Sequence, residues 1–236
     1  MYRLKQQIQD PWHGIDFLPL IQVRNHCYDL LRRTFLEEAS PEFLRSLVET
    51  DQIRFFPFFD ADALIADGAQ EAASYLEQFK ILPDETVDEL RSDYTRLFIG
   101  PNKLPAPPWE SAYLHEERLL FQKETLMVRR AYLKYHFLPK RYGHEADDHL
   151  GLELDFMYQL GLLALGAFQE QRFERYLSIL HDQKDFLSHH LLKWVGEFSN
   201  DVTAHARTAF YRGMAKILKG FLTLDLAALD ELLAVK

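Results

Sequence analysis

Hydrophobic residues recur at intervals of three and four along most of the chain, which is the period of an α-helix with one buried face. Leu20, Val23, Cys27 and Leu30 begin the pattern and predict a helix over about 16–39. A second, short helix is expected to begin at Ser40-Pro41, and another is expected to begin near 116 or 124 and to end at 137. The same spacing predicts further helices over 62–79, 83–98, 150–168, 172–189, 191–206 and 208–222, with a helical tail over 225–235. No stretch alternates with the period of two that β-strands require. We therefore expect an all-α protein, a single globular bundle of about eight to ten helices.

The segment 150–168 differs from the other predicted helices because apolar residues surround its whole axis. A helix without a wide polar face is covered by neighbours on most sides, so we expect it at the centre of the bundle. Gly151, Gly161, Ala164 and Gly166 would allow neighbouring helices to approach it closely.

One domain is expected over residues 1–236. Its least compact stretch, 123–147, is a possible hinge between N-terminal helices in 1–122 and C-terminal helices in 148–236.

Composition and charge limit the classes of partner and the cellular compartment that we expect for this protein. The formal net charge is −9, and no stripe of Lys and Arg offsets it, so nucleic acid is not an expected partner. The single cysteine, Cys27, indicates a reducing compartment. The first residues lack the apolar core of a signal peptide, and the longest apolar stretch, 160–168, is about half of the ~20 residues that a membrane span needs. We expect a cytoplasmic protein without membrane insertion. Arg32-Arg33 resembles an export motif, but no apolar segment follows it.

A search for catalytic and metal-binding motifs finds little. No histidine has a glutamate three residues before it, and His-Glu-x-x-His is missing, so no metal site is predicted. Phosphate-binding glycine loops and a nucleophile elbow are also missing. Asp147, Asp148 and His149 form the one compact polar cluster. On the residues alone, an acidic cap on the central helix is favoured, and a helical hydrolase using these three side chains is the alternative.

A stiff, proline-rich loop interrupts the helical pattern within the N-terminal half of the chain. Gly100, Pro101, Pro105, Pro107 and Pro108 exclude a helix between residues 99 and 108. The large side chains at its rims either pack against the core or present a rigid apolar surface to a partner. Such a surface suits a helical or extended peptide held by a few apolar anchors.

The segment Tyr94-Thr95-Arg96-Leu97-Phe98-Ile99-Gly100-Pro101, followed by Pro107-Pro108-Trp109-Glu110-Ser111-Ala112-Tyr113, resembles the signature of the TorD/DmsD family of molybdoenzyme maturation chaperones. Ala146-Asp147-Asp148-His149 is similar to the second signature of that family, and the resemblance extends over about 94–222. Asn102 and Ala146 stand where family members can carry Trp and Pro.

The resemblance implies an all-helical chaperone and not an enzyme. It implies that the protein binds the twin-arginine signal peptide of a molybdopterin-dependent oxidoreductase of the DMSO or TMAO reductase type. The apoenzyme would then be held until its cofactor is inserted, before export. Weak GTP binding, as in a GTP-linked assembly factor, and a monomer or domain-swapped dimer are also implied, and no cofactor is otherwise expected.

Carried over to this sequence, the implied peptide-binding residues are Tyr94, Leu97, Phe98, Gly100, Pro101, Pro108, Trp109, Glu110, Ser111, Asp148 and His149. We expect the apolar part of the peptide to lie against Leu97, Phe98 and Trp109, and Asp148 to meet its arginines.

Overall fold

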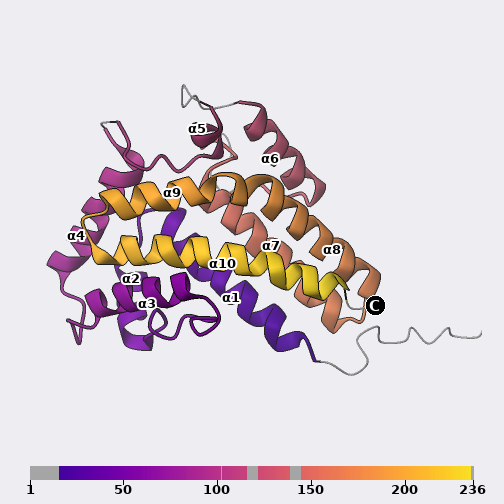
Figure 1. Cartoon of the computed structure of the whole chain (residues 1–236), viewed down its shortest axis with the longest axis horizontal. Helices are drawn as coiled ribbons and strands as arrows, with labels where there is room; N and C mark the ends of the chain where they lie inside the picture. Colours follow the sequence, from indigo (N-terminus) through magenta and orange to yellow (C-terminus); the bar gives the residue numbers. More distant parts are fainter. Residues whose placement is uncertain (1–15, 102, 116–121, 139–144, 235–236) are drawn as a thin grey trace, which may run out of the picture.

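The computed structural model of the chain describes residues 16–101, 103–115, 122–138 and 145–234, and it confirms the predicted all-α fold. In chain order the elements are α1 (Leu18–Phe35), α2 (Pro41–Thr50), α3 (Ala63–Leu76), α4 (Asp84–Tyr94), the π-helical turn η1 (Thr95–Ile99), α5 (Glu110–Leu114), α6 (Lys123–Lys134), α7 (Leu150–Gln169), α8 (Phe173–Phe186), the π-helical turn η2 (Leu187–Leu191), α9 (Leu192–His205) and α10 (Ala209–Ala234). Figure 1 shows α10 extending along the molecule beside α9, with α7 and α8 next to it and α3 below it. The helices α5 and α6 lie together at one edge.

The predicted central helix is confirmed. α7 packs on α1 along one side and on α8 along another, and Leu150, Leu154, Met157 and Leu160 are fully buried. By length and composition α7 could also cross a membrane, but 61% of its most apolar window is buried inside the protein. A core helix passes the same length and composition test, so its apolar character is explained by packing.

A buried ion pair joins the first helix to the last. Arg24 in α1 donates through Nε and Nη2 to the two carboxylate oxygens of Asp225 in α10, at 2.5 and 3.0 Å. The hydroxyl of Tyr28 also donates to Asp225, at 2.7 Å. A buried charge is tolerated only when it is paired and hydrogen-bonded, and here three donors satisfy one carboxylate.

Glycines allow some pairs of helices to approach each other closely. A Cβ atom built on Gly213 of α10 would lie 2.4 Å from the carbonyl oxygen of Gly68 in α3, and one on Gly68 would lie 2.5 Å from that of Gly213. The expected close approach at Gly151 and Gly161 is confirmed, against Leu36 and Asn25. The same expectation is wrong for Gly166, which has open space beside it.

Several predicted boundaries differ from the observed ones. The predicted helix 83–98 is α4 followed by η1, and the predicted break near residue 190 is instead η2, through which α8 continues into α9. α10 continues to residue 234, so the predicted helix 208–222 and tail are one element. α5 was not predicted. Arg32 and Arg33 lie within α1, in contact with Tyr158 and Phe43. Residues 116–121, including one predicted helix start, and Asn102 lie outside the described residues.

We expect Gly213→Ala to lower the free energy of unfolding by about 1–3 kcal/mol, because the added methyl group forces α3 and α10 apart. Urea unfolding measures the change. Gly196→Ala is the matched control, because nothing lies within 4 Å of its Cβ position and the helix propensity of alanine should raise stability by up to ~1 kcal/mol. Equal effects of the two substitutions would contradict the close crossing.

Candidate functional site

The proline-rich loop and the start of α7 pair with each other although about forty residues separate them. Trp109 and His149 form an antiparallel bridge. The amide of Glu110 donates to the carbonyl of Asp148 at 3.0 Å, and the amide of Leu150 donates to the carbonyl of Pro108 at 2.8 Å. The structure therefore brings together the two segments that carry the predicted site residues.

Asp148 joins three helices from a buried position. Its side chain is fully buried. One carboxylate oxygen accepts a hydrogen bond from the amide of Ser111 in α5 at 2.9 Å, and the other accepts from the hydroxyl of Thr125 in α6 at 2.8 Å. Both oxygens are therefore engaged inside the protein, and the expectation that Asp148 meets the arginines of a peptide stays a prediction.

The neighbours of Asp148 also have structural partners. Asp147 pairs with Nε of Arg129 at 2.5 Å, and its carbonyl accepts from the hydroxyl of Tyr132 at 2.9 Å. His149 is the N-cap of α7, where its Nδ1 accepts from the amide of Gly151 at 3.0 Å.

Burial lowers the pKa of His149 to about 4, although the negative charges of Glu145 and Asp148 act in the opposite direction. Its imidazole is therefore neutral near pH 7. Among the described residues, Asp147 bonds to Arg129, Asp148 bonds to Ser111 and Thr125, and His149 accepts from the amide of Gly151. These hydrogen bonds do not link the three side chains into an acid–histidine pair. This arrangement favours the helix-cap interpretation over the hydrolase alternative.

The apolar residues before the loop point into the core. Tyr94, Leu97 and Phe98 are buried, and the ring of Phe98 contacts those of Phe35 and Phe198 at centroid distances of 6.1 and 5.8 Å. Of the two interpretations of these side chains, core packing holds for Leu97 and Phe98, because η1 turns both of them inward. Their contact with a peptide stays a prediction. The apolar side chains left at the surface are Ile99, which is 61% exposed, and Trp109, which is half-buried.

The remaining predicted residues shape the loop. Gly100 has a φ of 106°, a conformation that favours glycine, and it ends η1 with its amide bonded to the carbonyl of Thr95 at 3.0 Å. Pro101 is exposed and Pro108 is buried. Glu110 and Ser111 are buried in the first turn of α5, so they support the loop from the inside.

A cleft of about 560 Å³ opens between η1, the end of α1 and the loop. We call it the Trp109 cleft; its lining residues are Leu36, Glu37, Glu38, Tyr94, Phe98, Ile99, Trp109, Glu145 and His149. The indole nitrogen of Trp109 donates to Glu145 at 2.8 Å, which fixes the ring at the cleft wall. Three glutamates line the cleft, and no Lys or Arg does so among the described residues. Sequence reasoning missed these glutamates because they come from segments outside the recognised motifs.

The residues that line the Trp109 cleft indicate the chemical class of ligand that would fit it. Carboxylates beside an apolar wall favour a segment that carries positive charge next to apolar side chains. The neutral imidazole of His149 adds no positive charge that would oppose such a segment.

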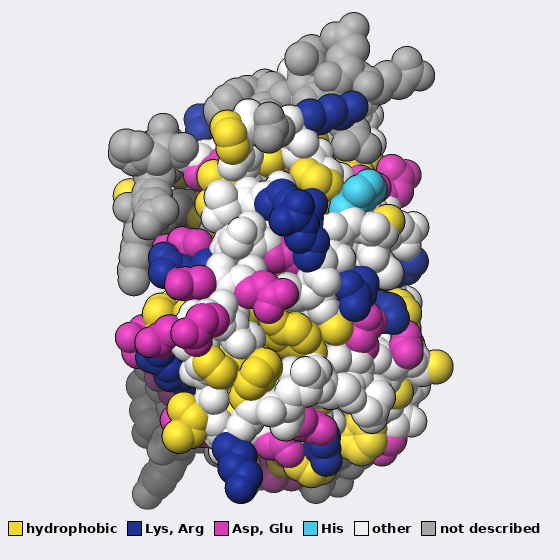
Figure 2. Space-filling model, turned by 90° about the vertical axis from the view of Figure 1, so that its left-hand side faces the viewer, with side chains coloured by type: hydrophobic (Ala, Val, Ile, Leu, Met, Phe, Trp, Pro, Cys, Tyr) yellow, Lys and Arg dark blue, Asp and Glu magenta, His cyan; other side chains and the backbone are white. Residues whose placement is uncertain are grey.

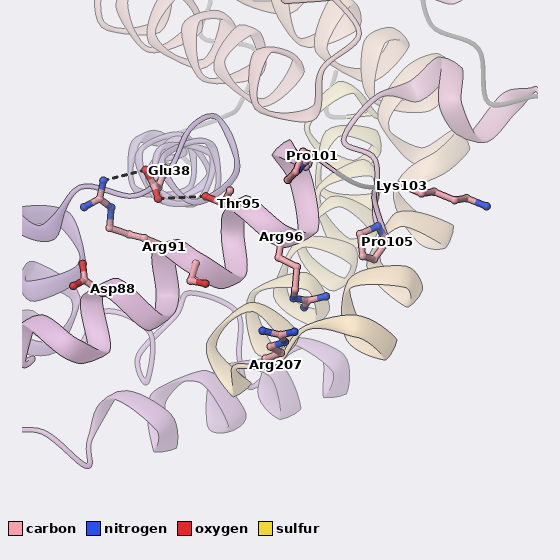
Figure 3. A pocket seen from close by; sticks show the side chains of 11 residues that line it. Glu38, Asp88, Arg91, Thr95, Arg96, Pro101, Lys103, Pro105 and Arg207 are labelled. Carbon is pink, nitrogen blue, oxygen red and sulfur yellow. Dashed lines mark hydrogen bonds and ion pairs between the residues drawn. The ribbon is translucent and has the colours of Figure 1, made fainter.

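A second pocket, of about 690 Å³, lies beside the Trp109 cleft and is lined by more basic than acidic residues, the acidic ones being Glu38 and Asp88. Figure 3 shows Arg96 and Arg207 pointing toward one another from η1 and from the turn before α10. Arg91 and Lys103 line the same pocket, and Arg91 donates to Glu38 at 3.1 Å. We call this the basic pocket. Glu38 lines both pockets. Figure 2 shows acidic and basic side chains interspersed over the end of the molecule at which α4 lies.

A buried polar cluster lies beneath α5. His190 of η2 is bonded through Nδ1 to Oε2 of Glu110 at 2.9 Å. Glu153 of α7 accepts at Oε2 from the indole of Trp194 at 3.3 Å. Burial, followed by the negative charges of Glu110 and Asp148, raises the pKa of Glu153 well above its usual value.

The fold and these features describe an all-helical protein with an acidic, partly apolar cleft and, among its described residues, no catalytic constellation. The family model described as "Nitrate reductase delta subunit" matches residues 62–200. The chain belongs to this family, and within it to the TorD/DmsD chaperones, as its signature segments predict.

The chain is 27% identical to the chaperone protein TorD of Aliivibrio salmonicida, over 86% of this chain and 92% of that protein. It is 32% identical to TorD of Aliivibrio fischeri, over 58% of this chain and 62% of that one. It is 29% identical to the Tat proofreading chaperone DmsD of Salmonella typhimurium, over 64% and 66%. A crystal structure from Archaeoglobus fulgidus, described as a candidate redox enzyme maturation protein, matches with a TM-score of 0.49 and 23% identity, over 85% of this chain and 93% of that one. The prediction of a chaperone and not an enzyme is confirmed.

We expect His149 to make stability depend on pH. The pKa of His149 is about 4 in the folded protein, and the ordinary value of 6.5 applies to the unfolded chain. The unfolded chain therefore takes up the proton more readily. This destabilising effect is nearly absent above pH 7 and grows as the pH falls from 6.5 toward 4, reaching about 2 kcal/mol by pH 5. Urea unfolding of the protein and of His149→Gln from pH 7 to pH 4.5 isolates the effect. Parallel pH curves would contradict it.

Proposed function

We propose that this chaperone binds the twin-arginine signal peptide of a molybdoenzyme catalytic subunit, of the DMSO or TMAO reductase type, in the Trp109 cleft. The protein then holds the apoenzyme in the cytoplasm until the molybdopterin cofactor is inserted, before export. The observation that carries this proposal is the combination of an apolar wall, Trp109 and Ile99, with three glutamates in one cleft. A relative from Salmonella is named a Tat proofreading chaperone, which supports the same client class.

The chemistry of a twin-arginine leader matches the two parts of the cleft. Its guanidinium groups can each form charge-assisted hydrogen bonds with a carboxylate of Glu37, Glu38 or Glu145. Its apolar segment follows the arginines and can lie against Trp109 and Ile99, since an aromatic ring fixed in position makes a strong binding anchor. The net charge of −9 assists the approach of a cationic peptide.

The complex must also release its client. A micromolar dissociation constant corresponds to about −8 kcal/mol, which delays export without blocking it. No covalent step is required. Weak GTP binding and a domain-swapped dimer stay predictions. Residues 139–144 of the predicted hinge lie outside the described residues.

We expect Trp109→Ala to weaken binding of the leader by about 2 kcal/mol, or roughly thirtyfold, because the ring supplies the exposed apolar anchor. Calorimetric titration with synthetic leaders from molybdoenzyme subunits of the same genome measures this, and circular dichroism should show unchanged helicity. Trp109→Phe keeps the ring but loses the indole bond to Glu145, so we expect a smaller loss. Unchanged affinity in Trp109→Ala, with saturable binding by the parent protein, would place the leader elsewhere on the chaperone.

We expect the double variant Glu37→Gln, Glu145→Gln to weaken binding of the Arg-Arg leader by about 1–3 kcal/mol, because charge-assisted hydrogen bonds are lost. Glu38 is left in place because its substitution would also remove the charge that pairs with Arg91, whereas glutamine at position 145 keeps an oxygen that can accept from the indole of Trp109. A leader with Ala-Ala in place of Arg-Arg should bind both proteins almost equally. Glu231→Gln, an exposed change in α10, is the matched control. Equal losses with both leaders would mean that the glutamates do not bind the arginines.

A further inference from the structure

Three potential metal ligands from distant parts of the sequence meet inside the protein. Glu110 begins α5, Glu153 lies in the first turn of α7, and His190 lies in η2. Each contributes one ligand atom, and these atoms all lie within 4.8 Å of one another. All three side chains are buried. The sequence search missed this cluster because it relied on ligands that are close together in the chain.

Charge balance in this cluster favours a cation. Two carboxylates share one buried site, and moving charged groups into a protein interior is costly unless they are paired. Among the ion pairs of the described residues, Glu110 pairs only with His190 and Glu153 is in none. A divalent ion between the two carboxylates would neutralise both.

The carboxylate of Glu153 supplies a second and independent observation. The indole of Trp194 holds its Oε2, whereas Oε1 is buried and receives no hydrogen bond from an N–H or hydroxyl donor among the described residues. The carboxyl of Glu110 beside it can donate only when one of the two carboxyls is protonated. The side chain of Glu153 is 0% exposed. In metal sites, a hydrogen bond to one carboxylate oxygen commonly orients the side chain so that its other oxygen can bind the metal.

We propose that Glu110, Glu153 and His190 bind a divalent first-row transition-metal ion, for which Zn²⁺ is the probe. Imidazole nitrogen and carboxylate oxygen are established zinc ligands, with bonds of about 2.0–2.2 Å. The separation of 2.9 Å between Nδ1 of His190 and Oε2 of Glu110 is close to that of two ligand atoms that share one ion. The ion would join α5, α7 and η2, and Glu110 directly follows Trp109 in the wall of the cleft.

The π-helical turn explains how His190 reaches this site. π-helical turns occur frequently at functional sites, because the extra residue redirects side chains relative to a regular helix. His189 and His190 are neighbours in η2, yet His189 is exposed and bonded to the carbonyl of Asp185, whereas His190 is buried against Glu110. His189 is therefore a matched control for the loss of one imidazole.

The test is equilibrium dialysis of the chelator-treated full chain against Zn²⁺, followed by metal analysis and by the shift in melting temperature. We expect one equivalent of Zn²⁺ per chain and a higher melting temperature, as for any ligand that binds the folded state. Glu153→Gln and His190→Gln should each weaken binding at least tenfold, while His189→Gln should leave it unchanged. Replacement of Zn²⁺ by Co²⁺ should give the visible absorption of a low-coordinate site in the parent protein and in His189→Gln, and not in Glu153→Gln or His190→Gln.

Two results would overturn the proposal. The first is the lack of saturable Zn²⁺ binding by the folded parent protein, which would mean that protons and not a metal balance the two carboxylates. The second is binding that persists in Glu153→Gln and His190→Gln, which would assign the metal to exposed histidines. Circular dichroism of each variant confirms that it is folded, and Glu110→Gln serves if either of them is not. Leader binding is measured separately, so the failure of one proposal leaves the other intact.

Discussion

The buried carboxylate of Asp148 is the interaction on which the candidate site depends. It binds the amide of Ser111 and the hydroxyl of Thr125, while the carbonyl of the same residue accepts from the amide of Glu110. One residue thereby holds α5, α6 and the start of α7 together. Because α5 is only five residues long, it is too short to be stable by itself. The position of Trp109, which precedes α5, therefore depends on this network together with the bond from its indole to Glu145.

The other wall of the Trp109 cleft rests on the aromatic core. Phe98 packs against Tyr94 and Phe198, with ring centroids 4.9 and 5.8 Å apart, and its backbone belongs to the turn that ends at Ile99. Edge-to-face and offset contacts of this kind stabilise a defined arrangement of rings. A cleft between two fixed walls loses little conformational freedom on binding, which suits an anchor-based interaction with a flexible leader.

The sequence predicted the parts of the fold that depend on local spacing. Apolar residues lie on all sides of the predicted helix 150–168, and this pattern can be read from one segment alone. It correctly indicated the central helix α7. The inward turn of Leu97 and Phe98 could not be predicted in this way, because a π-helical turn inserts an extra residue without a distinctive sequence signal. Glu110, Glu153 and His190 come together only because three separate elements pack against one another. No spacing pattern in the sequence predicts this cluster.

The acidic cleft and the basic pocket are electrostatically connected through Glu38. Its carboxylate lines both and accepts a hydrogen bond from Arg91, whose neighbours in the basic pocket are Arg96 and Arg207. A guanidinium group that binds Glu38 from the cleft side competes with Arg91 for the same carboxylate. If the proposed leader bound Glu38, thermodynamic linkage would make the effects of the two pockets on each other reciprocal. The shared position of Glu38 is the structural basis for such a link, because one carboxylate faces both groups of side chains.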